Sequence, residues 1–312
     1  MNVFVLGWYD NQNLGDEAFK DAFRHLWPQA NFTFSSDIRK FDPQVHGALW
    51  LGGGDIFGGN QFLELPPDVP VAVIGVGISG LNDAVRRVLD RAQIVIVRDH
   101  ASKTAYPRAH LAPDLIFSLP ERQIPPSENM VLMLLNDFFS PRRHSPWGTQ
   151  VHNGVFVNEM AKVVDGFVAQ KKRVVFAPMG VGGIDDRRAA AQVIGLLARP
   201  TAVDWILDPV SDDSLWDLVG RSSLVVTQRF HGMVYSAVSD RPCVAICGHK
   251  KLWELGQEIM PKSTVDYYGF TDRAFYTALT SQQQEQNFQG YRERAKALWR
   301  GLSAVVEKEF SL

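Results

Sequence analysis

A permanent cation and a titratable imidazole stand two residues apart at the end of an apolar run, in the segment "SSLVVTQRFHGMVYSAVSDRP". Arg229 and His231 follow "LVVT", which is typical of a buried strand, and a helical pattern that ends before Pro242 begins at Gly232. We expect Gly232 to bind substrate together with Arg229. A buried charge without a partner costs of the order of several kcal/mol. The segment therefore predicts either an acid buried beside Arg229 or an anion that arrives with a substrate.

A polar loop follows the first predicted strand, in the segment "GWYDNQNLGDEAF". The loop ends at Asn13 and is longer than a plain turn from strand to helix requires. Gly15 permits a close approach of backbone and ligand, and Asp16 can cap the helix that follows. We expect Asn13, Gly15 and Asp16 to bind substrate, and a capped helix without a ligand is the alternative.

A glycine-rich segment, "LGGGDIFGGN", follows the next apolar run and has five glycines in residues 52–59. Glycine lowers chain stability through its entropy and contributes no side-chain contact, so packing does not explain such a loop. Its amides could form a nest for an anion or a hydroxyl. We therefore expect Gly53 and Gly54 to bind substrate, with a structural crossing of the chain as the alternative.

The segment "VIGVGISG" matches the dinucleotide-binding pattern G-x-G-x-x-G through Gly75, Gly77 and Gly80. Asp99 stands at the end of the next predicted strand, where such sites place an acid for the ribose. The pattern therefore raises an NAD-dependent oxidoreductase as an alternative function. Its position on the third apolar run and the presence of Arg98 beside the acid argue against that function.

Two further charged segments follow strand-like runs. "VRDHAS" places Arg98 and Asp99 directly after a strand and Ser102 one turn into the next predicted helix. "LAPDLIF" places Asp114 after a proline, where its carboxylate could pair with an arginine or orient a base. We expect Arg98, Ser102 and Asp114 to bind substrate, and a structural Arg–Asp pair at the strand end is the alternative.

These residues belong to a chain of 312 residues, a length that favours two domains. Hydrophobic residues make up 46% and charged residues 21%, as in folded globular proteins, and the net charge of −2 implies no general attraction to nucleic acid. Cys243 and Cys247 lie four apart in a strand-like stretch, which predicts core thiols and a cytoplasmic location. The longest apolar stretch is about half of what a membrane span needs, so we expect no span.

Short apolar runs alternate with helical patterns along the chain, and most runs are apolar on both faces. This alternation predicts an α/β protein with parallel sheets. Prolines and polar residues over 118–129 separate two halves. We expect an N-terminal domain over residues 1–120, a C-terminal domain over 128–285, and a helix over 286–312 that packs back across the junction. Ligands bind such sheets beyond the carboxyl ends of the strands, so we expect the site in a cleft between the domains.

Six segments in this order together resemble the polysaccharide pyruvyl transferase family: "NQNLGDEA", "LGGGDIF", "GVGISG", "VRDHAS", "APDLIFSL" and "VVTQRFHGMVYSAVSDRPCVAI". The most specific feature is R-x-H-G, which leads into a helix and then into a strand that begins with proline. The resemblance covers residues 11–246 and implies two Rossmann-like domains facing a cleft, similar to the GT-B arrangement of glycosyltransferases. It also implies phosphoenolpyruvate as donor, a pair of sugar hydroxyls as acceptor, and a pyruvate ketal on a glycan or glycan precursor as product.

Carried onto this sequence, the resemblance implies that Arg98 and Arg229 bind the donor and that His231 acts as the catalytic acid. Phe230 stands between Arg229 and His231, where the family often has leucine. The chemistry agrees, because arginine forks suit the carboxylate and phosphate of phosphoenolpyruvate, and histidine titrates near neutral pH. We expect the C-terminal domain to be the donor side and the N-terminal domain, with its glycine-rich loops, to be the acceptor side.

The sequence contains no Walker lysine loop and no H-E-x-x-H, C-x-x-C or D-x-D pattern. We therefore expect no metal and no cofactor besides phosphoenolpyruvate as co-substrate. A lipid-linked acceptor would bring the protein to a membrane surface. Two further functions stay open: a GT-B glycosyltransferase that binds a nucleotide sugar through Arg229 and His231, and a degenerate family member that binds a glycan or a partner without turnover.

Overall fold

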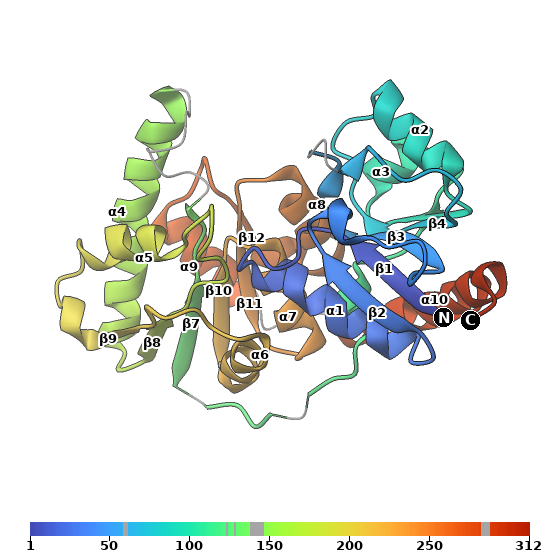
Figure 1. Cartoon of the computed structure of the whole chain (residues 1–312). Coiled ribbons are helices and arrows are strands. Elements are labelled where there is room, and N and C mark those ends of the chain that lie inside the picture. Colours follow the sequence, from blue (N-terminus) through green and yellow to red (C-terminus); the bar gives the residue numbers. More distant parts are fainter. Residues whose placement is uncertain (59–61, 123, 128, 138–146, 282–287) are drawn as a thin grey trace. The chain divides into compact units, whose positions relative to one another are not determined.

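The computed structural model describes residues 1–58, 62–122, 124–127, 129–137, 147–281 and 288–312. The chain divides into two compact units (Figure 1). Unit 1 contains residues 1–120 and 292–312, and unit 2 contains residues 121–291. The residues at which we expect the second domain and the last helix to begin, 128 and 286, lie outside the described part of the chain.

Unit 1 has, among its described residues, one parallel sheet of six strands with helices on its faces. The strands are β1 (Asn2–Leu6), β2 (Asn31–Ser35), β3 (Ala48–Gly54), β4 (Val71–Val76), β5 (Ile94–Val97) and β6 (His110–Leu111). The helices are α1 (Leu14–Leu26), α2 (Asp83–Arg91), α3 (His100–Ala105) and α10 (Phe288–Phe310), with short 3-10 turns at Ile38–Lys40, Ile56–Gly58 and Leu115–Ser118.

The C-terminal helix α10 completes the hydrophobic core of unit 1. β3 is buried along its whole length, and its Trp50 meets the ring of Trp27 edge-on, with the centroids 5.0 Å apart and both side chains fully buried. Trp27 Nε1 donates a hydrogen bond to the carbonyl of Ser303 in α10 at 3.3 Å. The ring of Phe310 meets Trp50 edge-on, with the centroids 5.4 Å apart. Helix α10 is therefore an integral part of this core.

Unit 2 repeats the architecture with one parallel sheet of six strands among its described residues. The strands are β7 (Met130–Leu134), β8 (Arg173–Phe176), β9 (Val203–Trp205), β10 (Leu224–Thr227), β11 (Cys243–Cys247) and β12 (Thr264–Asp266). The helices are α4 (Trp147–Ala169), α5 (Arg187–Ile194), α6 (Asp212–Arg221), α7 (Phe230–Val238), α8 (Lys250–Ile259) and α9 (Asp272–Ser281), with 3-10 turns at Pro200–Ala202 and Pro261–Ser263.

The strand order of each sheet contains one point where the direction of winding reverses. In unit 1 the order is β2-β1-β3-β4-β5-β6, and the reversal lies between β1 and β3. In unit 2 the order is β12-β11-β10-β7-β8-β9, which is the Rossmann order with its reversal between β7 and β10. Thr227 of β10 pairs with Leu134 of β7, so these two strands end level with each other. Open α/β sheets bind ligands beyond the carboxyl ends of the strands at such reversals.

The expected fold class, two Rossmann-like domains, is confirmed by these two sheets. The apolar runs of the sequence do not predict β2 and β12, which are both edge strands. The residues of β2 alternate between exposed and half-buried, so they lack the continuous apolar run of a central strand. The run "AHLAPDLIF" forms only the short strand β6 and then a 3-10 turn, because Pro113 interrupts it.

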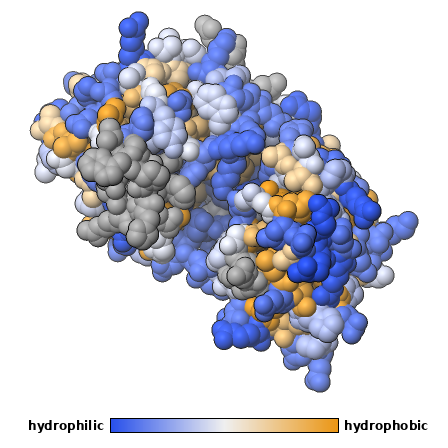
Figure 2. Space-filling model, turned by 90° about the horizontal axis from the view of Figure 1, so that it is seen from above, coloured by the Kyte–Doolittle hydropathy of each residue, from blue (hydrophilic) through white to orange (hydrophobic). Residues whose placement is uncertain are grey.

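Large hydrophobic side chains at the surface are scattered over many elements. Those that are most exposed include Val45, Val155, Leu207 and Tyr268, which belong to different parts of the two units. On the face drawn in Figure 2, hydrophobic patches alternate with hydrophilic ones. Within the described residues, none of the helices combines the length and the apolar character needed to cross a membrane.

Candidate functional site

Arg229 lies two residues after the end of β10 and directly before helix α7, and Asp186 holds its guanidinium. Arg229 Nε donates to Asp186 Oδ2 at 3.0 Å, and Nη2 donates to Oδ1. The side chain of Arg229 is 11% exposed and that of Asp186 is 1% exposed. The buried cation that the sequence places here therefore has an internal acid, which the sequence analysis does not select.

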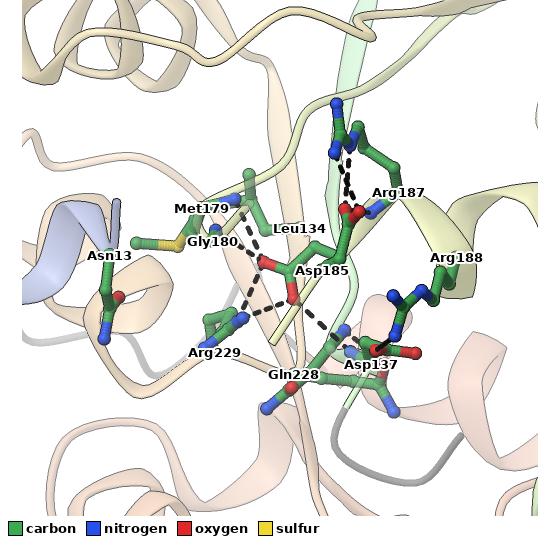
Figure 3. Close-up of polar contacts among 12 residues, drawn as sticks. Asn13, Leu134, Asp137, Met179, Gly180, Asp185, Arg187, Arg188, Gln228 and Arg229 are labelled. Atoms are coloured by element: carbon green, nitrogen blue, oxygen red, sulfur yellow. Dashed lines mark hydrogen bonds and ion pairs between the residues drawn. The ribbon is translucent and has the colours of Figure 1, made fainter. Parts of the chain in front are cut away.

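Asp186 comes from the loop after β8 and receives donors from the ends of three strands. Its Oδ2 accepts from the amides of Met179 at 3.0 Å and Gly180 at 2.9 Å, and its Oδ1 accepts from the amide of Asp137 after β7 at 3.3 Å (Figure 3). Burial raises the pKa of the Asp186 carboxyl, and Arg229 together with these amides opposes the shift. The carboxylate thus joins the loops after β7, β8 and β10.

Arg229 retains donors that could bind a ligand. A guanidinium has five N–H donors, and Asp186 takes those of Nε and one of Nη2. The donors that remain, on Nη1 and Nη2, make no hydrogen bond with any residue in the described part of the chain. Nη1 and Nη2 together form a planar fork that matches a carboxylate or a phosphate. The ion pair with Asp186 is therefore compatible with anion binding on the opposite side of the group.

His231 lies in the first turn of α7, two residues after Arg229, and is half-buried. Its ring lies edge-on to that of Phe230, with the centroids 5.2 Å apart and an interplanar angle of 88°. The next residue, Gly232, packs against the end of β10. A Cβ atom at Gly232 would lie 2.3 Å from Thr227 Oγ1. Close packing thus accounts for Gly232, and its assignment to substrate binding stays a prediction.

A second histidine lies at the same edge of the unit 2 sheet. His249 follows β11, the neighbour of β10, and precedes helix α8. Burial, with the nearby charges of Lys251 and Arg229, lowers the pKa of His249 from 6.5 to about 4. The imidazole is therefore neutral near pH 7. The sequence analysis gives His249 no role, because a single histidine after an apolar run is a weak signal.

In unit 1, Arg98 follows β5 and pairs with Asp114. Arg98 Nη1 lies 3.2 Å from Asp114 Oδ2, and the two side chains are only 3% and 1% exposed. Asp114 also accepts a hydrogen bond from the amide of Ile116 at 3.1 Å and so caps the 3-10 turn after β6. A Cβ atom at Gly77 would lie 3.3 Å from Asp99 Oδ2 and 3.4 Å from Arg98 Nε, so the loop after β4 packs closely on this segment. The structural Arg–Asp pair, one of the two alternatives for this segment, is present.

Asp99 and Ser102 have structural partners at the start of α3. Asp99 Oδ1 accepts from the amide of Ser102 at 2.7 Å, which makes Asp99 the N-cap of that helix. The buried hydroxyl of Ser102 accepts from the amide of Ile78 at 2.7 Å and so fixes the loop after β4. The acid that the dinucleotide-binding pattern would use for ribose is thus engaged as a helix cap.

Asn13, Gly15 and Asp16 lie at the start of α1, directly after β1. Asn13 Nδ2 donates to Asp16 Oδ2 at 2.6 Å, and Asp16 is 8% exposed. Gly15 is buried within the first turn of the helix. These residues stand at the reversal point of the unit 1 sheet, where a ligand of this sheet is expected.

Gly53 and Gly54 end β3 on the other side of that reversal point. Their φ angles are 74° and 78°, in the region that only glycine adopts easily. A Cβ atom at Gly53 would lie 2.2 Å from Phe19, and one at Gly54 would lie 2.8 Å from Asp16 Oδ1. Both glycines are thus needed for the close approach of α1 to β3. Gly59, at the end of the same glycine-rich segment, lies outside the described residues.

The predicted site residues fall into three groups. At the reversal point of the unit 2 sheet lie Arg229, His231 and Gly232; at that of the unit 1 sheet lie Asn13, Gly15, Asp16, Gly53 and Gly54; around β5 and β6 lie Arg98, Ser102 and Asp114. Asp186 and Gly180 are not among the predicted site residues. The segment "MGVGGIDD" after β8 carries a signal for both, since it combines a glycine-rich loop with paired acids after a strand. Within the described residues, no group of three or more His, Cys, Asp or Glu could hold a metal ion.

Comparison with known protein families gives one match that covers most of the chain. The family model described as polysaccharide pyruvyl transferase matches residues 13–247. No curated protein sequence matches the chain.

Solved structures match over nearly the whole chain at low identity. The UDP-GlcNAc 2-epimerase of Methanocaldococcus jannaschii is 11% identical with a TM-score of 0.62, over 99% of this chain and 100% of that one. The UDP-N-acetylglucosamine 2-epimerase of Rickettsia bellii is 8% identical with a TM-score of 0.56, over 100% and 97%. A trehalose-6-phosphate synthase is 8% identical with a TM-score of 0.53, over 94% and 77%. These likenesses support the GT-B-like fold and, at such identity, the fold alone.

Proposed function

Because the chain belongs to the polysaccharide pyruvyl transferase family, we propose that it transfers a pyruvyl group from phosphoenolpyruvate to two hydroxyls of a sugar or glycan, with release of phosphate. The product is a pyruvate ketal on the acceptor. The single observation that carries this proposal, beside the family match, is the guanidinium of Arg229. It is fixed by Asp186 on one side, and its Nη1/Nη2 fork, two residues from His231, has no hydrogen-bond partner among the residues that the structure describes.

The donor explains why such a fork is useful. Phosphoenolpyruvate carries a carboxylate and a phosphate on one small carbon frame, and a guanidinium fork binds either group with two parallel hydrogen bonds. The start of helix α7 adds backbone amides and the positive end of the helix dipole. We propose that Arg229 binds the donor in unit 2. The donor-binding role that the family resemblance implies for Arg98, which pairs with Asp114, stays a prediction.

His231 is the proposed acid. It protonates the methylene carbon of the enol, which becomes the methyl group and leaves positive character on the adjacent carbon. One sugar oxygen bonds to that carbon, and a second sugar oxygen then displaces phosphate. Of the two hydroxyl protons, one balances the proton given to the methyl group and the other leaves with phosphate. Arg229 and the start of α7 stabilise the departing phosphate.

The acceptor side is proposed in unit 1, at Asn13, Asp16 and the loop around Gly54. An amide and a carboxylate held together at 2.6 Å are suitable partners for sugar hydroxyls. The net transfer is redox-neutral, so it needs no redox cofactor, and we propose that it needs no metal either. The two buried free thiols, Cys243 and Cys247, agree with a reducing compartment such as the cytoplasm.

The test is an assay of phosphate release from phosphoenolpyruvate against a panel of sugars, glycans and lipid-linked glycans, run in deuterated water. We expect acceptor-dependent release and one solvent deuterium in the methyl group of the ketal, read by NMR. Intact phosphoenolpyruvate with every acceptor would contradict the proposal.

A second candidate is a glycosyltransferase that consumes a nucleotide sugar. It is favoured by one observation, that two of the solved structures with this fold are enzymes named for UDP-N-acetylglucosamine. The same panel with UDP-sugars in place of phosphoenolpyruvate separates the two functions. Release of UDP with intact phosphoenolpyruvate would favour the second candidate.

A further inference from the structure

We propose that Asp186 and Gly180 are positioning residues that aim the Nη1/Nη2 fork of Arg229 at the anionic donor. This inference rests on the proposed function and extends it to two residues of the loop after β8. Asp186 occupies the Nε/Nη2 side of the guanidinium and thereby fixes the plane of the group. The fork at the far end is then presented in one orientation.

The arrangement around Asp186 is more elaborate than an ion pair needs. The carboxylate accepts from three backbone amides besides Arg229, and these come from the loops after β7 and β8. A carboxylate held by so many donors is itself immobile. Asp186 thus links the fixed backbone after β7 and β8 to the side chain of Arg229 after β10. This link restricts the guanidinium, because a long side chain such as arginine otherwise keeps considerable rotamer freedom.

Gly180 supplies the space for this orientation. A Cβ atom at Gly180 would lie 2.8 Å from Arg229 Nη2, which is closer than real Cβ contacts occur. The amide of the same residue donates to Asp186 Oδ2 at 2.9 Å. Gly180 therefore binds the acid through its backbone and admits the guanidinium through its missing side chain. An alanine here would keep the first contact and disturb the second.

The Arg229–Asp186 pair lies close to His231, the proposed acid, so its geometry should affect the transfer directly. Arg229 follows β10 and Asp137, whose amide holds Asp186, follows β7, so the cluster spans the reversal point of the unit 2 sheet. His231 is two residues further along the same helix start. A displacement of the fork by about 1 Å would move the donor relative to the acid, and misplacement of that size can cost about 100-fold in rate.

The same loop offers matched controls. Asp185, next to Asp186, forms its own pair with Arg187, with Nε to Oδ1 at 2.8 Å and Nη2 to Oδ2 at 2.8 Å. Gly183, three residues after Gly180, would place a Cβ atom with nothing within 4 Å. Asp185→Asn and Gly183→Ala therefore repeat the chemical changes of Asp186→Asn and Gly180→Ala away from Arg229.

The experiment measures steady-state kinetics of the full chain with phosphoenolpyruvate and with the acceptor found in the assay above. We expect Asp186→Asn to lower kcat/KM for phosphoenolpyruvate about 100-fold and Gly180→Ala to lower it about tenfold, with KM for the acceptor changed less than about threefold. Asp185→Asn and Gly183→Ala should stay within about threefold of the wild type. Thermal melting of all four variants shows whether each is folded.

Chemical rescue separates positioning from a general structural role. Added guanidinium ion should partly restore Arg229→Ala, because Asp186 can hold the free ion, and should not restore Arg229→Ala with Asp186→Asn. Equal rescue of both, or an Asp186→Asn enzyme as active as Asp185→Asn, would overturn the positioning role and leave the function standing. A wild-type protein that is inert with phosphoenolpyruvate and every acceptor would instead overturn the proposed function and, with it, the donor assignment.

Discussion

Both units contain an arginine just after a strand, buried against an aspartate. In unit 1 the residues are Arg98 and Asp114; in unit 2 they are Arg229 and Asp186, where Gly180 also leaves room for the guanidinium. The two sets differ in place. Arg229 lies beside the reversal point of its sheet, while Arg98 follows β5, which β4 and β3 separate from the reversal between β1 and β3.

The two pairs also differ in geometry. The Asp186 carboxylate engages two nitrogen atoms of Arg229, and the guanidinium keeps 11% exposure. Arg98 is 3% exposed, and its partner Asp114 also caps a 3-10 turn. If the position on the sheet decides whether such a pair serves a ligand or the fold, substitutions of Asp186 should affect catalysis and substitutions of Asp114 should affect stability.

The largest expected effect is that of His231→Ala. The general acid of the proposed reaction would be lost, and general acids contribute about 100- to 10,000-fold to rate. Because His231 is half-buried in the first turn of α7, the variant should melt near the wild-type temperature. Steady-state kinetics with phosphoenolpyruvate measures the loss. Activity within tenfold of the wild type would remove the imidazole from the mechanism.

The next effect tests the other side of the comparison. Asp114→Asn removes the carboxylate that faces Arg98 in a site where both side chains are almost fully buried. Breaking one partner of a buried pair costs about 3–5 kcal/mol. Denaturant unfolding, with hydrogen exchange of unit 1 peptides as the local probe, should show this loss.

The exposed pair of Arg39 and Asp37 provides the control for that experiment. Asp37→Asn should leave the unfolding midpoint of unit 1 unchanged, because the Arg39 side chain is 87% exposed. If Asp114→Asn were equally silent and instead raised KM for phosphoenolpyruvate, the Arg98 pair would resemble that of Arg229, and the contrast between the units would fail.

Gly53→Ala should destabilise unit 1 by at least about 2 kcal/mol, because the residue has a φ of 74° and its Cβ atom would overlap Phe19. Gly58→Ala is the matched control, since nothing lies within 4 Å of a Cβ atom there. Thermal melting checks the difference. A Gly53→Ala protein with unchanged melting and weakened acceptor binding would show that this loop acts through its ligand.

The effect that is smallest near neutral pH is a dependence of unit 2 stability on acid. The folded chain takes up a proton on His249 only near pH 4, while the unfolded chain does so near 6.5. Acid therefore favours the unfolded state, and the free energy of unfolding should fall as the pH is lowered through this window. Hydrogen exchange of unit 2 peptides measures the slope. His249→Gln should flatten it, and His25→Gln, at an exposed position of α1, should leave it unchanged.

The sequence predicts the central strands of both sheets well. It predicts the edge strands and the ion-pair partner of Arg229 poorly. Runs such as "VPVAVIGVG" and "SSLVVT" are apolar on both faces because helices cover both sides of a parallel sheet, and they became β4 and β10. The edge strand β2 has no such pattern. Arg229 and His231 were visible through their position after a strand. Asp186 was not, because its partner is 43 residues away in sequence and only the strand order brings the two together.

The contribution of α10 to the core of unit 1 has a consequence for biosynthesis. Trp27 and Trp50 find partners in Ser303 and Phe310, which the ribosome adds after the whole of unit 2. During synthesis, residues 1–120 therefore lack part of their aromatic core until residues 292–312 have been added. By then all the described strands of unit 2 have been synthesised. The portion translated first would be the last to reach its native state.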